Sequence, residues 1–339
     1  DTGNPSSGSV TLSGTVTYTY YSVNQTTGIA YNSPSEKPIR GAVVALQNSS
    51  GTVLATTNTS QTGSYSFSAP ANSTVRVVVK AALGPPDSPR VTVVDNTNAG
   101  ALYATYLDVT TGTANLTSNF NANSGWGSTS YTGERAAAPF AVLDTIYQAE
   151  VLIKSADPNV QLPALVVNRS KNNKPTSGNK ALGEITSSHY APADGSLYIL
   201  GSADLDTDEY DTHVMAHEWG HYFENKLGRS DTTGGSHSPE DILDPRLAFG
   251  EAWGNALSGM VFNDPIYIDT GGASQASIGL KLNLDTDSAP DTKTYTTTTN
   301  ATYLVDGFYS EASVQEVLYD LFDSGTSTAD DDSLSLGFK

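Results

Sequence analysis

The first part of the chain alternates apolar and polar positions with a period of two. Such a period places successive side chains on opposite faces of a strand, so each alternating run predicts a half-buried β-strand. Turn residues separate the runs at short intervals, which is typical of an all-β sandwich of short strands. The runs are VTLSGTVTYTY (10–20), GAVVALQ (41–47), TGSYSFSAP (62–70), TVRVVVK (74–80), RVTVVDN (90–96) and ALYATYLDVTT (101–111).

The pattern changes after NANSGWGSTSYTG (121–133), a Gly-, Ser- and Asn-rich segment that is typical of a linker. Apolar residues then recur at helical spacing in 134–154, which predicts a long helix. Two strands are predicted at 162–168 and 196–204, followed by three helices. The first of these helices carries HEWGH, the second begins at Asp244–Pro245, and the third begins near Ser310 with a buried face predicted at Val314, Val317, Leu318, Leu321 and Phe322.

The charge distribution also divides the chain. Residues 1–125 hold five basic and five acidic side chains, so all of the net charge of −19 falls on residues 126–339. Together with the change of pattern, this predicts a β-sandwich accessory domain at 1–125 and an α+β domain at 126–339. We expect a multidomain protein in which the first part carries no chemistry of its own.

Composition limits the partners that the chain can have. A strongly acidic surface argues against binding to nucleic acids or anionic membranes, which needs basic patches. No stretch approaches the ~20 apolar residues of a membrane helix, so no membrane span is predicted. The chain opens on Asp1 and a Gly/Ser/Asn tail, as if a leader had been removed, and we therefore expect a secreted, extracellular protein. We also expect a monomer.

HEWGH at 217–221 has the spacing of a zinc-binding helix. His217 and His221 lie at i and i+4, about 40° apart around a helix and ~6 Å along it, so both imidazoles can reach one cation. Glu218 projects beside them, where it can take a proton from a water molecule rather than bind the metal. The alternative is an amphipathic helix with two hydrogen-bonded histidines. Because the chain has only five histidines, we favour a zinc site.

A zinc site of this kind needs a third protein ligand, and several residues compete for it. His213 lies on the same helical face but far along the axis, and His237, in a loop, is not excluded by its spacing. Glu251 is favoured because its neighbours on the predicted helix are apolar or small, and a buried glutamate needs a strong partner. Asn255 lies one turn further on the same face, where it could orient a ligand histidine.

These two motifs carry a resemblance to a known family. HEWGH followed by GEAWGNA (250–256) resembles the gluzincin metallopeptidases, thermolysin-like and especially fungalysin-like, whose second motif has the form GExWxD. The resemblance covers about residues 195–325 and implies a zincin-type peptidase domain acting on protein or peptide substrates. It also implies that SLYILG (196–201) presents a sheet edge to an extended substrate. The roles that it implies are zinc ligands for His217, His221 and Glu251, and general base for Glu218.

Two positions depart from this family. Asn255 stands where the second motif usually ends in Asp, so it would orient a histidine without adding charge. Thermolysin-like enzymes also place a histidine downstream that donates a hydrogen bond to the oxyanion, and no histidine follows His237. Tyr309, directly before the helix start at Ser310, is the candidate for this role, since other gluzincins use a tyrosine.

The β-rich first part resembles prealbumin-like modules related to the carboxypeptidase regulatory domain, on the evidence of GTVTY, GAVVAL and GSYSFSAP. Two alternative functions stay open: an inert adhesion protein on a peptidase scaffold, and a peptidase directed at glycoproteins. Calcium is a further possibility because Asp204, Asp206 and Asp208 offer oxygen ligands. This run fails the EF-hand template, in which Glu209 would have to be Gly.

Overall fold

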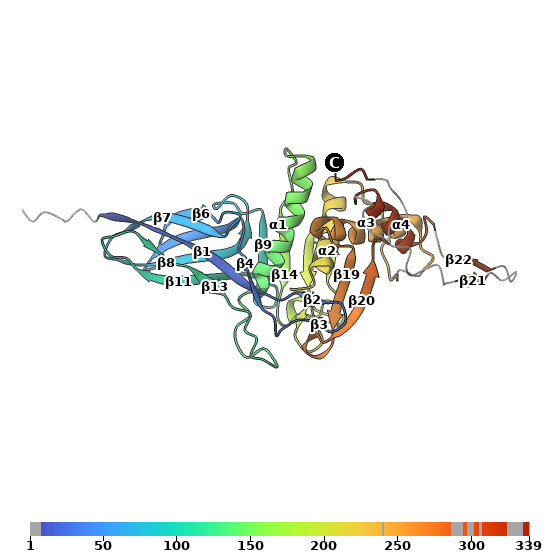
Figure 1. The fold of residues 1–339 in the computed structure, drawn as a ribbon, viewed down its shortest axis with the longest axis horizontal. Helices are drawn as coiled ribbons and strands as arrows, with labels where there is room; N and C mark the ends of the chain where they lie inside the picture. The colour runs from blue at the N-terminus through green and yellow to red at the C-terminus, as the bar shows by residue number, and fades with distance from the viewer. Residues whose placement is uncertain are drawn as a thin grey trace, which may run out of the picture.

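The structure is a computed structural model (Figure 1) that describes residues 8–238, 241–285, 294–296, 302–304, 307–323 and 335–338. The opening tail at 1–7, from which a removed leader was predicted, and the last residue lie outside these residues. The described chain is rich in β-strands, which form several sheets, and it contains four α-helices. This confirms the coarse prediction of a β-rich multidomain fold.

A five-stranded sheet surrounds the long first strand, β1 (Ser9–Tyr20). It pairs antiparallel with β7 and β4 and parallel with two short strands that come about a hundred residues later in the sequence. Alternate residues of β1 are buried, as the period of two predicts. The partner strands are β4 (Ser35–Pro38), β7 (Ser64–Pro70), β12 (Leu116–Thr117) and β13 (Phe120–Ala122).

A nine-stranded sheet crosses the predicted domain boundary at 125/126. Its main path runs β15-β16-β14-β9-β8-β5-β6, and the parallel pairing of β9 with β14 joins strands from the two sides of that boundary. The strands are β5 (Ala42–Asn48), β6 (Val53–Asn58), β8 (Thr74–Leu83), β9 (Val91–Asp95), β10 (Ala101–Leu102), β11 (Ala104–Thr110), β14 (Leu165–Arg169), β15 (His189–Ala191) and β16 (Ser196–Ile199).

One apolar core joins the two sheets and the helices. It contains inward residues of β1 and β7 together with those of β5, β8 and β9, so the two sheets pack against each other. The first helix, α1 (Ala138–Ala156), lies in the middle of the molecule between the N-terminal sheets and the other helices (Figure 1). Its contacts with both β8 and α2 (Thr212–Leu227) explain why residues almost all round this helix are buried.

The remaining helices lie on the far side of α1. They are α3 (Pro245–Phe262) and α4 (Glu311–Asp320), and the side chains of Asp244 and Ser310 cap them as the sequence predicted. A hairpin, β19 (Ile266–Gly271) with β20 (Ser277–Asn283), packs beside α2 and α3. The short elements are β2 (Val23–Asn24), β3 (Gly28–Ile29), η1 (Lys180–Leu182), β17 (Gly201–Ser202), β18 (Asp206–Thr207), η2 (Ala273–Gln275), β21 (Thr294–Thr296) and β22 (Thr302–Leu304).

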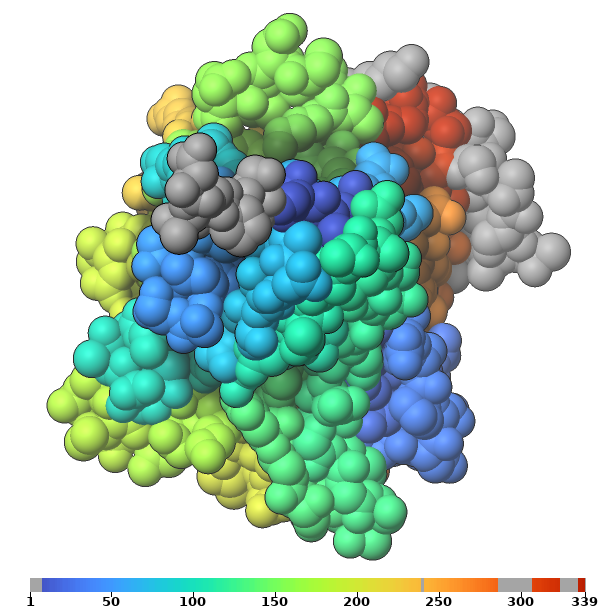
Figure 2. All heavy atoms as spheres, turned by 90° about the vertical axis from the view of Figure 1, so that its left-hand side faces the viewer, coloured from blue at the N-terminus to red at the C-terminus, as the bar shows by residue number. Residues whose placement is uncertain are grey.

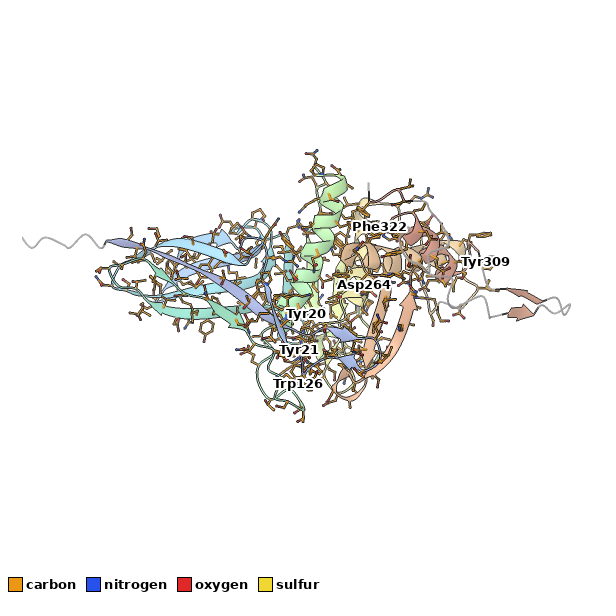
Figure 3. The ribbon with its side chains drawn as sticks, in the orientation of Figure 1. Tyr20, Tyr21, Trp126, Asp264, Tyr309 and Phe322 are labelled. Carbon is orange, nitrogen blue, oxygen red and sulfur yellow. The ribbon has the colours of Figure 1, made fainter. Side chains whose placement is uncertain are left out.

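An aromatic cluster connects the end of β1 to the start of α2. The rings of Tyr20 and Tyr21 contact Tyr210, which lies two residues before α2 begins. Trp126, from the predicted linker, stacks on Tyr31 at a centroid distance of 3.7 Å, so this segment packs on the protein at the same junction (Figure 3). Seen from the left-hand end of Figure 1, strands of the N-terminal sheets occupy the centre of the visible surface (Figure 2).

Two further expectations concern a membrane-spanning helix and the edge of the large sheet. Within the described residues, none of the helices is both long and apolar enough to span a bilayer. The prediction that SLYILG forms a sheet edge is wrong, because β16 lies between β14 and β15. The edge strand at this end of the large sheet is β15, the three-residue strand His189–Ala191.

Candidate metal centre

Helix α2 presents His217, Glu218 and His221 to a cavity because its opposite face is fixed in the core. Trp219 and Tyr222 are completely buried and their rings contact each other. Turning these residues inward leaves His217, Glu218 and His221 to line a cavity of about 680 Å³. The start of the helix is also fixed, since Oδ2 of Asp211 accepts hydrogen bonds from the backbone and side chain of Thr270 on β19.

Close approach of α2 and α3 brings the two motifs together. Gly220 of HEWGH faces Gly254 of GEAWGN, and a Cβ at Gly220 would lie 3.3 Å from the Cα of Gly254. A Cβ at Gly254 would lie 2.7–2.8 Å from three ring atoms of His217. Only a glycine at position 254 therefore leaves room for the imidazole of His217 in its present position.

Three side chains meet at this helix crossing in a geometry that fits zinc. The Nε2 atoms of His217 and His221 are 2.9 Å apart, and each lies 3.2 Å from Oε2 of Glu251. Zinc bonds of about 2.0–2.1 Å at tetrahedral angles separate ligand atoms by about 3.3 Å. The predicted set of His217, His221 and Glu251 is thus brought together with the spacing and the donor types that zinc prefers.

Asn255 fixes the tautomer of one of these histidines. Its Oδ1 lies 2.7 Å from Nδ1 of His217, and because an amide oxygen only accepts, this nitrogen carries the proton. In neutral His217, the lone pair is then on Nε2, which points into the cluster. The orienting role predicted for Asn255 agrees with this hydrogen bond.

Helix α4 fixes the amide of Asn255 in turn. Its Nδ2 donates to Oε1 of Glu311 at 2.7 Å and to Oε1 of Gln315 at 2.8 Å, so the amide cannot rotate without losing both bonds. The predicted buried face of α4 is therefore wrong in part: Val317 is 58% exposed, whereas Glu311 and Gln315 are buried. On this inward face the two polar residues lie beside the buried Ala312 and Tyr319.

The charges around the cluster favour a cation at its centre. Burial opposes ionisation of Glu251, but hydrogen bonds from His217, His221 and His237 outweigh burial and lower its pKa far below the usual range. Burial likewise opposes a charge on His217, and the carboxylates of Glu251 and Glu218 overcome it and raise its pKa to about 9. Negative surroundings of this strength would also stabilise a bound metal ion.

Glu218 lines the same cavity without joining the three ligand-capable residues. Its Oε2 accepts a 2.7 Å hydrogen bond from the backbone N–H of Tyr190, in the edge strand β15. This bond holds the carboxylate between the cluster and the sheet edge. The position agrees with that expected for a proton acceptor rather than for a ligand.

The other predicted candidates lie in different places. Nε2 of His213 is 3.2 Å from the backbone oxygen of Asp264, away from the cluster, and burial lowers its pKa. His237 lines the cavity with Nε2 3.2 Å from Oε2 of Glu251, a contact that its loop position did not reveal in the sequence. Tyr309 packs on Phe308 beside α4 and is not among the cavity-lining residues (Figure 3). The structure therefore does not bring Tyr309 to the metal centre.

Sequence reasoning missed Glu311 and Gln315, which approach the cluster from α4, whereas it kept His237 as a possible ligand. Glu311 and Gln315 are four residues apart, so they share a helical face, which was the one available signal. Comparison with known proteins adds no assignment: no protein-family model matches the chain, and no curated protein matches its sequence.

Proposed function

We propose that the protein is a zinc-dependent metallopeptidase that hydrolyses peptide bonds of extracellular proteins. The observation that carries this proposal is the convergence of His217, His221 and Glu251 within 3.2 Å of one another, with Glu218 beside them in one cavity. A structural zinc site normally has four protein ligands, whereas three protein ligands in an open cavity are typical of a catalytic one.

The proposed chemistry assigns a task to each side chain. His217, His221 and Glu251 would hold zinc, which when bound acidifies water and polarises a carbonyl group. Glu218 accepts the proton of the attacking water and passes it to the amine that leaves. Asn255 keeps His217 in the tautomer that binds metal, and the amide of Asn255 depends on Glu311 and Gln315.

The cavity also supports a mode of substrate binding. The edge strand β15 lies at its rim, where an extended peptide could add to the sheet. For the donor to the developing oxyanion, the cavity lining supports His237 rather than Tyr309. The same proposal includes four points that rest on the sequence alone. They are a zincin-type fold for the second part, a prealbumin-like accessory role for the first part, secretion and a monomeric state.

The decisive experiment measures zinc content and casein hydrolysis on the same preparations. We expect about one zinc per chain, lost in His217→Ala and His221→Ala. Glu218→Gln should keep the zinc and the fold but lose activity by several orders of magnitude. Glu224→Gln is the matched control, because it lies on the same helix but does not line the cavity, and it should stay active.

Two results would contradict the proposal. Near wild-type hydrolysis by Glu218→Gln would show that this residue is not the base. Full zinc content without hydrolysis of casein or of a mucin-type glycoprotein would instead favour the inert adhesion protein, and hydrolysis of the glycoprotein alone would favour the glycoprotein-directed peptidase.

A further inference from the structure

A second group of metal-capable side chains lines the same cavity. Asp206 on β18, Asp208 just before α2, and Asp269 on β19 each offer a carboxylate oxygen, and the three oxygens lie within 4.8 Å of one another. Only two of these residues belong to the acidic run at 204–208. The third comes from a strand about sixty residues later, and the first residue of the run, Asp204, is exposed and outside the cluster.

One member of this group is buried and lacks a full set of partners. Asp208 is only 2% exposed, and its Oδ2 accepts a hydrogen bond from the hydroxyl of Ser188. Its Oδ1 has no hydrogen-bond partner among the described residues, and neither has Oδ1 of Asp206. A buried carboxylate oxygen without a partner is costly, so the site calls for a ligand that supplies positive charge.

The protein supplies no such charge from its own described side chains. Glu209, in the same segment, forms ion pairs with both Arg135 and Arg169. In contrast, within the described ranges no lysine or arginine forms an ion pair with Asp206, Asp208 or Asp269. Burial, followed by the neighbouring carboxylates, raises the pKa of Asp208, and the same two causes raise the pKa of Asp269 to about 7.

We propose that Asp206, Asp208 and Asp269 bind a divalent cation of the Ca²⁺ type. All the available ligand atoms are oxygens, which hard cations prefer and which distinguish this site from the histidine-containing cluster. The burial of Asp208 and the small spacing of the three carboxylates fit a compact ion rather than the long cationic side chain of a substrate. A bound ion would join the segment before α2 to β19, and so hold the start of the helix that carries HEWGH.

The test uses the full, zinc-loaded chain and measures Ca²⁺ binding by titration calorimetry, with terbium luminescence as a second probe. Tyr267, two residues before Asp269 on the same strand face, is placed to sensitise the terbium signal. We expect one Ca²⁺ per chain and a higher melting temperature in its presence. Asp269→Asn should weaken binding at least about tenfold. Asp204→Asn is the matched control from the same acidic run and should bind as the wild type does.

Asp269→Asn is the deciding variant, because a change at the buried Asp208 would also alter its hydrogen bond with Ser188. Absence of Ca²⁺ uptake by the wild type, or equal uptake by wild type and Asp269→Asn, would overturn the proposal. So would binding of a lysine-rich peptide that Ca²⁺ does not displace and that Asp269→Asn abolishes. Zinc content and casein turnover are measured on the same samples, so failure of the proposed peptidase function remains distinguishable from failure of this site.

Discussion

Replacing Asn255 by Asp tests the hydrogen-bond chain that leads from α4 to the metal centre. The substitution restores the residue expected from the gluzincin motif and preserves the shape of the side chain. It also removes the amide N–H groups that donate hydrogen bonds to Glu311 and Gln315, and it places a second carboxylate against Glu311. We therefore expect Asn255→Asp to be harmful in this chain, although the resemblance alone would favour it.

The expected cost follows from these contacts. Each buried acceptor that loses its donor costs about 1–3 kcal/mol. Two carboxylates about 4 Å apart repel by about 4 kcal/mol at an effective dielectric constant of 20, and protonation of one of them relieves part of this cost. Asn255→Asp should therefore lower the free energy of unfolding by about 3–5 kcal/mol, as breaking a buried charged pair does.

A second substitution separates this mechanism from a general loss of packing. In Glu311→Gln the amide oxygen can still accept from Asn255, so the single change should cost less than about 1 kcal/mol. In the double variant Asn255→Asp/Glu311→Gln, the amide of residue 311 can donate to the carboxylate of residue 255. The double variant should therefore recover at least about 2 kcal/mol of the free energy of unfolding. Urea unfolding of the metal-free proteins gives these free energies, and competition with a chromogenic chelator gives zinc affinity, which should fall by about 10–100-fold in Asn255→Asp. A coupling energy below about 0.5 kcal/mol would refute the hydrogen-bond chain.

Two further predictions concern the cavity. His237→Gln should lower kcat by about 10²–10³-fold, because an oxyanion donor is lost, whereas Tyr309→Phe should leave kcat and KM near their wild-type values; the opposite result in peptide hydrolysis would restore the assignment of Tyr309. In the metal-free protein, burial raises the pKa of Asp269 to about 7 from an ordinary value of 3.8, so the folded state binds this proton more tightly than the unfolded state. The stability that this proton contributes is therefore present below about pH 4 and lost as the pH rises towards 7. Thermal melts should show this loss in the wild type and a smaller one in Asp269→Asn, and Ca²⁺ should suppress it; equal pH profiles for the two proteins would contradict the reasoning.

The sequence predicted well what depends on local signals. The helix with HEWGH follows from the i, i+4 spacing, and the starts of α3 and α4 follow from Asp244, Pro245 and Ser310. The meeting of Glu251 with the two histidines was also predictable, because a buried carboxylate needs a partner and because the two motifs resemble those of the gluzincins.

Other features depend on contacts between distant segments and carry no local signal. The pairing of β9 with β14 extends one sheet across a boundary that charge and periodicity place at 125/126. The inward face of α4 was predicted from its apolar residues, but the observed face includes Glu311 and Gln315, which accept hydrogen bonds from Asn255, and it leaves Val317 exposed. In both cases a tertiary contact outweighs the local pattern.

The structure also shows where some of the acidic side chains of the second half of the chain lie. From the sequence, the charge of −19 on residues 126–339 is most simply explained by solubility. Yet six of these carboxylates, Asp206, Asp208, Glu218, Glu251, Asp269 and Glu311, line one cavity. Low-dielectric walls that carry charges of one sign focus the field, so cations are drawn to this cavity in preference to the outer surface. This concentration of negative charge inside the protein is what the proposed zinc and Ca²⁺ sites share, and it explains why carboxylates that would destabilise the fold when unpaired can persist beside one another.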